Sequence, residues 1–337
     1  MNTRFLFLSL LTTFTVLLSS CGNKEVEGPI FTEGLNLIVQ NEFESLPAKV
    51  SVFFKVETLD GTPVAGLTES DFTILENDKL ISEDEAARQI SPRAQRFAYS
   101  TLLILDLSAS VTNNRLPRLK EAAKLFINSV IPDNSDGSIE VAISWFDGED
   151  KLHELHEFTS NKGALTDAIE SITPDISLDN STDLFGAVIK GVDIIEDVFF
   201  EYQNDDRISA ASVVVFTDGT DQAARFTEER ALQAVLDADE SISFYSIGLG
   251  NEIDEGVLQR IGRDDFAFAE NTNQLIETFE RIAGIVSDDA NSYYLFEYCS
   301  PKRNGQHDVT IEATFENLQG SVTTQFDAAG FGGGCSL

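Results

Sequence analysis

The sequence predicts an α/β protein whose main domain is a doubly wound, mostly parallel β-sheet with helices on both faces. Two continuous apolar runs, 102–105 and 213–216, are typical of central strands that are buried on both faces. From residue 100 onward, strand-like and helix-like segments alternate along the chain, as they do in a parallel sheet. Both apolar runs lead into loops that carry aspartates, at the sheet edge where open α/β folds bind ligands.

The elements of this domain follow from the spacing of its apolar residues. Helical spacing predicts helices over 117–130, 163–172, 183–200, 222–236, 255–261 and 272–286. Besides the two central runs, we expect strands over 138–146, 152–158, 242–249 and 266–268, with 152–158 as an edge strand paired with 138–146. We place the whole domain at residues 98–288.

The segments on either side of this domain have strand patterns. In residues 35–97, an alternating run at 50–56 precedes a turn cluster, and in 289–337 the expected strands are 293–298, 308–315 and 321–326. Asn304-Gly305 is a hairpin signal. Because the last strands have too little apolar surface to form a domain alone, we predict that 289–337 and 35–97 form one small β-sandwich into which the α/β domain is inserted. The alternative is a separate C-terminal appendage.

Five oxygen-bearing side chains are expected to lie together at one edge of the sheet, because four of them follow the central strands and the fifth precedes a helix. Asp106, Ser108 and Ser110 alternate directly after the first central strand, and Asp218 ends the second. Thr182 stands just before a predicted helix; taken alone, it reads as a helix N-cap. Two carboxylates and three hydroxyls, completed by water, form the hard oxygen shell that Mg²⁺ and Mn²⁺ prefer.

This set resembles the metal-ion-dependent adhesion site of von Willebrand factor A-type domains, and the resemblance extends roughly over residues 100–288. It implies that Asp106, Ser108 and Ser110 form the first ligand loop, Thr182 the second and Asp218 the third. It further implies a divalent metal, for which Mg²⁺ is the best candidate and Mn²⁺ or Ca²⁺ the alternatives. In this family, an Asp or Glu carboxylate of a protein or peptide partner usually completes the metal shell.

The first residues resemble a bacterial lipoprotein signal. The apolar run 5–18 follows Arg4 and is too short to span a bilayer comfortably, and Leu18-Ser19-Ser20-Cys21 resembles a lipoprotein box. We therefore expect residues 1–20 to be a signal peptide, Cys21 to be lipidated and 21–34 to be a tether. The alternative is an ordinary secretory signal. Gly22 after the cysteine is compatible with the outer membrane, so we expect a cell-envelope protein anchored by its lipid.

The three cysteines fit this localisation. If Cys21 is lipidated, Cys299 and Cys335 remain as a pair, which we expect to form a disulfide in an oxidising compartment. Three scattered cysteines without a C-x-x-C motif indicate no zinc site. The formal net charge of −34 argues against nucleic acid as a partner and against electrostatic docking on an anionic membrane. An acidic surface raises the local concentration of divalent cations, but a solubility or salt adaptation explains it equally well.

The sequence shows no catalytic apparatus, and we predict a non-enzyme. It contains no G-x-S-x-G, Walker or dinucleotide-binding motif after a strand. His153, His156 and His307 lie outside the three ligand loops. The odd spacing of His153 and His156 places them on opposite faces of a strand, so we expect surface or hydrogen-bonded histidines that cannot share a metal.

The functional hypothesis is a cell-envelope lipoprotein that binds a protein partner through a divalent metal. An alternative of another class is a structural component of envelope assembly, in which the metal only stabilises the fold. A third, an envelope hydrolase, needs an acid–base group near the metal, and the sequence offers no candidate.

Overall fold

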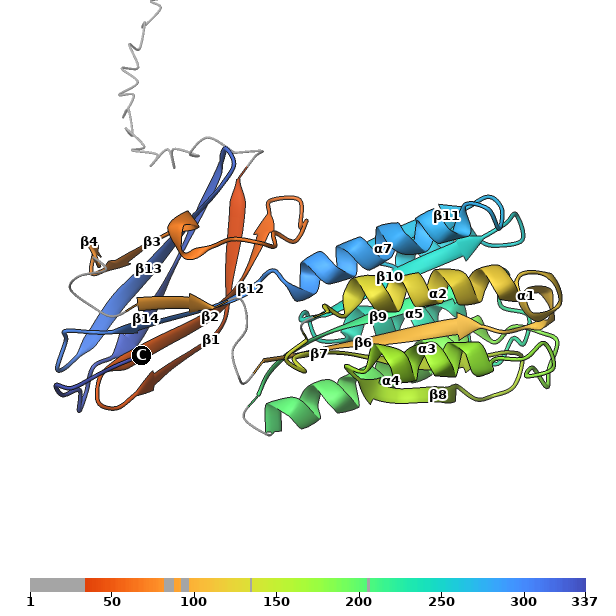
Figure 1. Cartoon of the computed structure of the whole chain (residues 1–337), viewed down its shortest axis with the longest axis horizontal. Coiled ribbons are helices and arrows are strands. Elements are labelled where there is room, and N and C mark those ends of the chain that lie inside the picture. The colour runs from red at the N-terminus through yellow and green to blue at the C-terminus, as the bar shows by residue number, and fades with distance from the viewer. Residues whose placement is uncertain (1–33, 82–87, 92–96, 134, 205–206) are drawn as a thin grey trace, which may run out of the picture. The chain divides into compact units, whose positions relative to one another are not determined.

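The computed structural model describes residues 34–81, 88–91, 97–133, 135–204 and 207–337 (Figure 1). The predicted signal peptide, the lipidated Cys21 and the tether up to residue 33 lie outside the described residues. The described strands form one six-stranded sheet and two four-stranded sheets.

The six-stranded sheet has the order β11-β10-β9-β6-β7-β8. Its strands are β6 (Phe97–Asp106), β7 (Ile139–Phe146), β8 (His153–Thr159), β9 (Ile208–Thr217), β10 (Ile242–Leu249) and β11 (Asp265–Ala269). All neighbours pair in parallel except β7 and β8, which pair antiparallel. Every residue of β6 is buried, as the apolar run predicts for a central strand. The predicted doubly wound, mostly parallel sheet is thereby confirmed.

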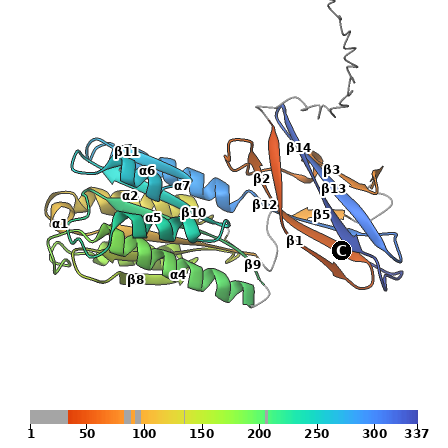
Figure 2. The same ribbon diagram turned by 180° about the vertical axis from the view of Figure 1, so that it is seen from behind.

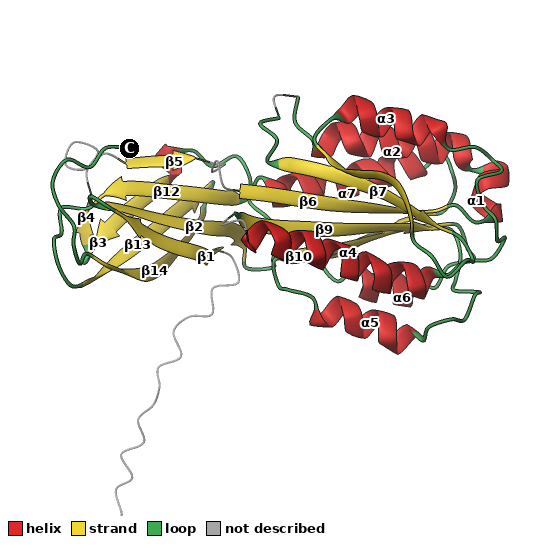
Figure 3. Cartoon of the chain, turned by 90° about the horizontal axis from the view of Figure 1, so that it is seen from below, coloured by secondary structure: helices red, strands yellow, loops and turns green. Residues whose placement is uncertain are grey.

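Helices cover both faces of this sheet (Figure 3). They are α1 (Ala109–Asn114), α2 (Leu116–Val130), α3 (Lys162–Ser171), α4 (Leu184–Asn204), α5 (Glu228–Asp237), α6 (Glu255–Ile261) and α7 (Leu275–Ala290). Leu103 and Leu105 of β6 join a core with α2, α3 and α7, while Leu102 and Ile104 join a second core with α4, α5 and α6. Alternate side chains of one strand thus supply two opposite cores. The helices of these two cores lie on opposite faces of the sheet (Figures 2 and 3). Among the described helices, none combines the length and the apolar character needed to cross a membrane.

Helix α5 begins six residues later than predicted, so the expected helix over 222–236 is wrong at its start. Thr227 is the N-cap, and its hydroxyl accepts a hydrogen bond from the Arg230 amide. The residues before it are held elsewhere: the amides of Gln222 and Ala223 donate to the carbonyl of Thr182. Ala224 has a positive φ of 51°, which ends any helical continuation.

Two antiparallel sheets form the β-sandwich. One has the order β1-β2-β12-β5 and the other β14-β13-β3-β4. The strands are β1 (Leu35–Ser45), β2 (Lys49–Thr58), β3 (Phe72–Glu76), β4 (Lys79–Leu80), β5 (Arg88–Ser91), β12 (Tyr293–Cys299), β13 (Gln306–Phe315) and β14 (Leu318–Asp327). Strand β12 pairs with β2 and β5, and β13 pairs with β3. The strands that follow the α/β domain therefore pair with strands that precede it, which is the pairing that an insertion requires.

The end of the chain is connected back to the sandwich. Cys299 and Cys335 form the disulfide expected of them. The hairpin expected at Asn304-Gly305 is wrong, because the strands on its two sides, β12 and β13, belong to different sheets. The tight hairpin in this region joins β13 to β14 instead, with Phe315 opposite Leu318 and Glu316 at a positive φ of 53°.

Strand β2 is buried on both of its faces, although its alternating pattern suggested a single buried face. Val52 and Phe54 lie in the core of the sandwich, whereas Phe53 lies in the core that includes α2 and α7. The Phe53 ring stacks on Tyr293, the first residue of β12, with 5.7 Å between ring centroids. The α/β domain therefore covers the outer face of this sandwich sheet.

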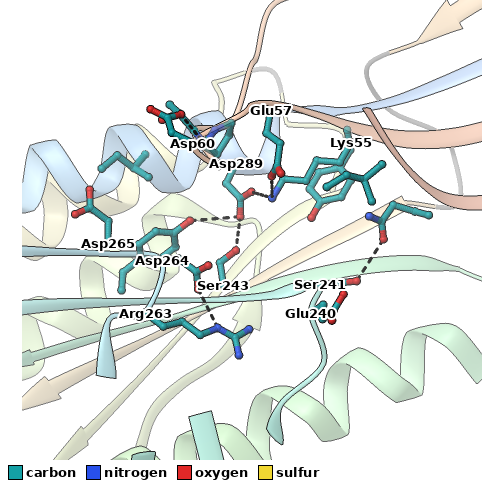
Figure 4. A pocket seen from close by; sticks show the side chains of 18 of the residues that line it. Lys55, Glu57, Asp60, Glu240, Ser241, Ser243, Arg263, Asp264, Asp265 and Asp289 are labelled. Atoms are coloured by element: carbon teal, nitrogen blue, oxygen red, sulfur yellow. Dashed lines mark hydrogen bonds and ion pairs between the residues drawn. The ribbon is translucent and has the colours of Figure 1, made fainter. Parts of the chain in front are cut away.

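A buried ion pair crosses the same contact (Figure 4). Lys55 Nζ lies 2.8 Å from Asp289 Oδ1, and these side chains are 15% and 1% exposed. The second oxygen of Asp289 accepts hydrogen bonds from Tyr99 and Ser243. Burial lowers the pKa of Lys55, but the charges of Asp289 and Glu57 outweigh it, so the pKa of Lys55 is raised overall. The ammonium therefore stays charged.

This ion pair lines a cavity of about 740 Å³ whose other ionisable residues are mostly acidic. Its second basic residue, Arg263, is engaged by the carbonyl oxygens of Val235 and Ile242. Figure 4 shows acidic side chains on several sides of the pair. Removal of Lys55 would thus leave Asp289 buried in an acidic environment.

We expect Lys55→Met to lower the free energy of unfolding by about 3 kcal/mol, because it leaves the buried Asp289 carboxylate without its counter-ion. The double variant Lys55→Met/Asp289→Leu should recover part of this loss. Lys49→Met is the matched control on the same strand, because the Lys49–Glu297 pair is more exposed, and it should cost about 1 kcal/mol or less. Urea unfolding measures all three, and equal losses in both single variants would contradict a special role for the buried pair.

Candidate metal centre

The parallel pairing of β6 with β9 brings two carboxylates together. Leu105 pairs with Phe216, so Asp106 at the end of β6 and Asp218 just after β9 leave the sheet side by side. The chain continues from β6 to β7 on one side and reaches β9 on the other. The two aspartates therefore lie at the point where strand order reverses, which is the usual ligand site of open α/β sheets.

Asp106 is fully buried and held on both of its oxygens. The Ser108 amide donates to Oδ1 at 2.9 Å, and the Thr217 hydroxyl donates to Oδ2 at 2.6 Å. Sequence reasoning missed Thr217, although its place at the end of the second central strand was a signal for it. These two hydrogen bonds fix the direction of the carboxylate.

The two serines connect the first loop to the third. Ser108 is the N-cap residue of α1, and its hydroxyl oxygen lies 3.3 Å from that of Ser110. The Ser110 hydroxyl donates a hydrogen bond of 2.7 Å to Asp218 Oδ1. Asp106, Ser108, Ser110 and Asp218 are thus linked in one polar cluster.

Thr182 joins this cluster from the second loop. It is 2% exposed, and its carbonyl oxygen accepts the amides of Gln222 and Ala223, which follow Asp218 in the chain. A Cβ built on Gly219 would lie 3.7 Å from Thr182 Oγ1, so the hydroxyl faces the exit of the third loop. The N-cap position of α4 belongs to Asp183, whose carbonyl accepts the Ala187 amide. Thr182 is therefore not the helix cap.

Burial and the charge of a neighbouring carboxylate act on the two aspartates of this cluster. Burial, together with the charge of Asp218, raises the pKa of Asp106 from 3.8 to about 6. Burial also raises the pKa of Asp218, against the opposing effects of Ser110 and Arg115. A divalent cation would relieve this repulsion, and two carboxylates with three hydroxyls are a suitable donor set for Mg²⁺ or Mn²⁺. The residues present fit a divalent metal.

Arg115 is a member of the site that sequence reasoning missed. It lies at the junction of α1 and α2, and its guanidinium forms an ion pair with Asp218 Oδ2. No sequence signal distinguished it, because the pairing joins residues that are distant in the chain. Arg115 supplies a positive charge that competes with a metal for Asp218.

Asp183 is a further buried carboxylate beside Thr182. Its Oδ1 has no hydrogen-bond partner among the described residues, and burial raises its pKa. Lys190 and Arg225 lie at 3.6 and 3.9 Å from its Oδ2. The site is therefore bordered by acidic and basic side chains beyond the five predicted ligands.

A doubly wound sheet with a polar cluster at its switch point defines an α/β ligand-binding domain. The family model of the von Willebrand factor type A domain matches residues 102–283, more than half of the chain, so the chain belongs to this family. No curated protein sequence matches the chain.

Three solved structures resemble the chain at low sequence identity. A von Willebrand factor type A protein from Catenulispora acidiphila has a TM-score of 0.48 and 10% identity, covering 88% of this chain and 73% of that one. The conserved hypothetical protein BatB from Bacteroides thetaiotaomicron has a TM-score of 0.45 and 18% identity, covering 58% and 100%. The vWF domain of the type V pili tip protein Mfa5 from Porphyromonas gingivalis has a TM-score of 0.43 and 13% identity, covering 56% and 95%.

The raised pKa of Asp106 predicts a pH dependence of the metal-free protein. Because the folded state holds this proton up to a pH of about 6 and the unfolded state releases it near 3.8, stability falls as pH rises through this interval. Between pH 5 and pH 7 the free energy of unfolding should fall by about 1 kcal/mol more in the wild type than in Asp106→Asn. Urea unfolding of metal-free protein measures both slopes, and parallel slopes would contradict the raised pKa.

Replacement of Arg115 should strengthen metal binding. In Arg115→Gln the competing charge on Asp218 is lost, so we expect Mg²⁺ affinity to rise by about tenfold, which corresponds to about 1.4 kcal/mol. Isothermal titration of wild type and variant measures this, with Arg118→Gln as a control because Arg118 pairs with the exposed Glu121 instead. Weaker Mg²⁺ binding in Arg115→Gln would show that Arg115 supports the centre.

Proposed function

We propose that this chain binds a protein partner through a divalent metal held by Asp106, Ser108, Ser110, Thr182 and Asp218. The observation that supports the proposal is the polar cluster that links Asp106, Ser108, Ser110 and Asp218 around two buried carboxylates, with Thr182 buried beside the third loop. Side chains so arranged have a strong electrostatic reason to hold a cation.

The metal we propose is Mg²⁺, with Mn²⁺ or Ca²⁺ as alternatives, because all five donors are hard oxygen atoms. A bound ion would supply a positive coordination position that an Asp or Glu carboxylate of a partner can take. The protein side chains orient the ion: Thr217 and the Ser108 amide fix Asp106, and Ser110 fixes Asp218. Ser110 is the exposed member of the five, so the partner would approach from its side.

The cell-envelope localisation is part of the same proposal and rests on the N-terminal sequence. Leu18-Ser19-Ser20-Cys21 after a short apolar run supports lipidation of Cys21 and removal of residues 1–20. A disulfide between Cys299 and Cys335 is consistent with an oxidising compartment outside the cytoplasm. The lipid would be the link to the membrane, since the acidic chain has little attraction for anionic lipid.

We also propose that the chain is not an enzyme. Three polar side chains at the centre serve the carboxylates: Thr217 donates to Asp106, Ser110 donates to Asp218, and Arg115 pairs with Asp218. A hydrolase would need a base positioned beside the metal. The alternative function is a structural envelope component, because a metal between two buried carboxylates would also stabilise the fold.

The variant Asp106→Ala separates these functions. In the wild type, Mg²⁺ at one hundred times its Kd should stabilise the fold by about 2.7 kcal/mol, and this gain should vanish in Asp106→Ala. Capture of partner proteins from an envelope extract should require Mg²⁺ and should also be lost in the variant. Asp167→Ala, an exposed change on α3, is the control that should keep both properties.

The pattern of results decides between the two readings. Metal-dependent stability with metal-independent capture would support the structural role and overturn the adhesion mechanism. Stability and capture that are both unchanged in Asp106→Ala would exclude a metal at this centre.

A further inference from the structure

A second cluster of metal-ligating side chains lies in the connection between β7 and β8. Asp147 follows the last residue of β7, Glu149 lies in the connection, and His153 begins β8. Each offers one ligand atom, and these atoms all lie within 4.8 Å of one another. Asp147 is fully buried, while Glu149 and His153 are half-buried. None of the three belongs to the oxygen cluster at Asp106.

His153 is the unusual member of this cluster. Its ring stacks on Trp145 with 4.0 Å between centroids and an interplanar angle of 8°, so its orientation is fixed. Its Nε2 atom is buried and has no hydrogen-bond partner among the residues that the structure describes. That atom instead faces Glu149 Oε2 at 3.3 Å. A buried imidazole nitrogen without a hydrogen bond is costly, and a bound cation would satisfy it.

The spacing of these two atoms suits a specific coordination geometry. In a tetrahedral site, zinc bonds of about 2.0–2.1 Å place neighbouring ligand atoms roughly 3.3–3.4 Å apart. The separation of His153 Nε2 and Glu149 Oε2 matches this value. The third ligand, Asp147, has its ligand atom within 4.8 Å of the other two, so a small movement would bring it to bonding distance of the ion.

Asp147 is oriented by its surroundings as ligating carboxylates usually are. Its Oδ2 accepts hydrogen bonds from the Ser177 hydroxyl and from the amides of Leu178 and Asp179. Within the described part of the chain, its Oδ1 accepts one hydrogen bond, from the Glu149 amide, which leaves a lone pair of that oxygen for a metal. The hydrogen bonds thus hold the carboxylate without using all of its ligand capacity.

Gly148 allows the two loops that build this cluster to approach each other. A Cβ at this position would lie 1.9 Å from Ser181 Oγ and 2.4 Å from Asp179 Oδ1, which is sterically forbidden. The Gly148 carbonyl also accepts a hydrogen bond from the guanidinium of Arg225, which is distant in the sequence. A glycine is therefore required between the two acidic ligands.

We propose that Asp147, Glu149 and His153 form a second metal site that binds a first-row transition ion, Zn²⁺ in the first place, with a fourth position open to water. An imidazole nitrogen with two carboxylates suits Zn²⁺, whereas Mg²⁺ prefers oxygen donors alone. His156 takes no part, because its ring nitrogens are not among the ligand atoms that lie together here. The sequence reasoning considered His153 only together with His156, whereas in the structure His153 has carboxylate neighbours of its own.

This site and the five-oxygen centre lie on adjacent strands but are independent. Asp106 pairs with Phe146, the residue before Asp147, and the carbonyl of Asp147 accepts the amide of Asp183, next to Thr182. Zinc at the second site would stabilise the loop over 177–183 without contributing a ligand to the first centre. The second site does not depend on the proposed adhesion function.

The chain contains its own reporter for the second site. Trp145 is the single tryptophan of the sequence and stacks directly on His153. Zn²⁺ or Co²⁺ bound to the imidazole should therefore change tryptophan fluorescence, and Co²⁺ should quench it. Co²⁺ in a nitrogen- and oxygen-bound tetrahedral site should also absorb visible light, which is a signature that Mg²⁺ sites do not give.

The test is a titration of the full chain with Zn²⁺ and with Co²⁺ in the presence of excess Mg²⁺. We expect one equivalent of Zn²⁺ to bind with a change in Trp145 fluorescence, and His153→Gln to weaken binding by at least about tenfold. Glu149→Gln should weaken it as well, and it guards against a folding defect in His153→Gln. Two controls should keep wild-type zinc affinity: His156→Gln on the same strand, and Asp106→Ala at the other centre.

Three results would overturn the proposal. The first is wild-type chain that binds no zinc while a circular dichroism spectrum shows it to be folded. The second is zinc affinity that is unchanged in both His153→Gln and Glu149→Gln. Loss of zinc binding in Asp106→Ala alone would assign the ion to the five-oxygen centre and would equally refute a second site.

Discussion

The parallel hydrogen bonding of β6 with β9 is the constraint on which the rest of this structure depends. Both strands are apolar and buried almost throughout, so neither can accept a charged residue before it leaves the sheet. Their register makes them end at the same level, with Leu105 opposite Phe216. The first charged residues beyond that level, Asp106 and Asp218, are therefore neighbours. The pairing of these two strands is therefore sufficient to explain why the two aspartates are close together.

The sequence predicted the central sheet because buried strands have a local pattern, and the same kind of pattern led to the proposal of five oxygen ligands at its edge. Continuous apolar runs identify buried strands, and alternating Asp and Ser after a strand place side chains around one point. Arg115 and Thr217 escaped this reasoning, because their partners Asp218 and Asp106 are brought to them only by the fold. The start of α5 was mispredicted for a related reason: the carbonyl of Thr182 binds the amides of 222 and 223 and keeps that stretch out of the helix.

The contact between the sandwich and the α/β domain was also beyond local pattern. Alternation along β2 correctly indicated a strand, but Phe53 and Lys55 point to the face that the other domain covers. A residue such as Lys55 reads as a solvated charge until its buried partner, Asp289, is known. Asn304-Gly305 misled in the same way: Gly305 has the positive φ of 83° that such a dipeptide allows, but the pair connects strands of different sheets. Turn chemistry specifies a local bend and leaves the pairing of the flanking strands to the packing around them.

Two buried aspartates at neighbouring strand ends show how differently one fold can accommodate a carboxylate. Asp147 accepts four hydrogen bonds, three of them from the segment 177–179 and one from the Glu149 amide. Asp106 accepts hydrogen bonds from Ser108 and Thr217 but also faces the charge of Asp218, which contributes to its raised pKa. The hydrogen bonds from the loop stabilise the negative charge of Asp147. At Asp106, by contrast, a second carboxylate lies close by and the two negative charges repel each other. In a chain with a net charge of −34, distant basic residues offer little relief, so this pair of carboxylates is where a cation has most to stabilise.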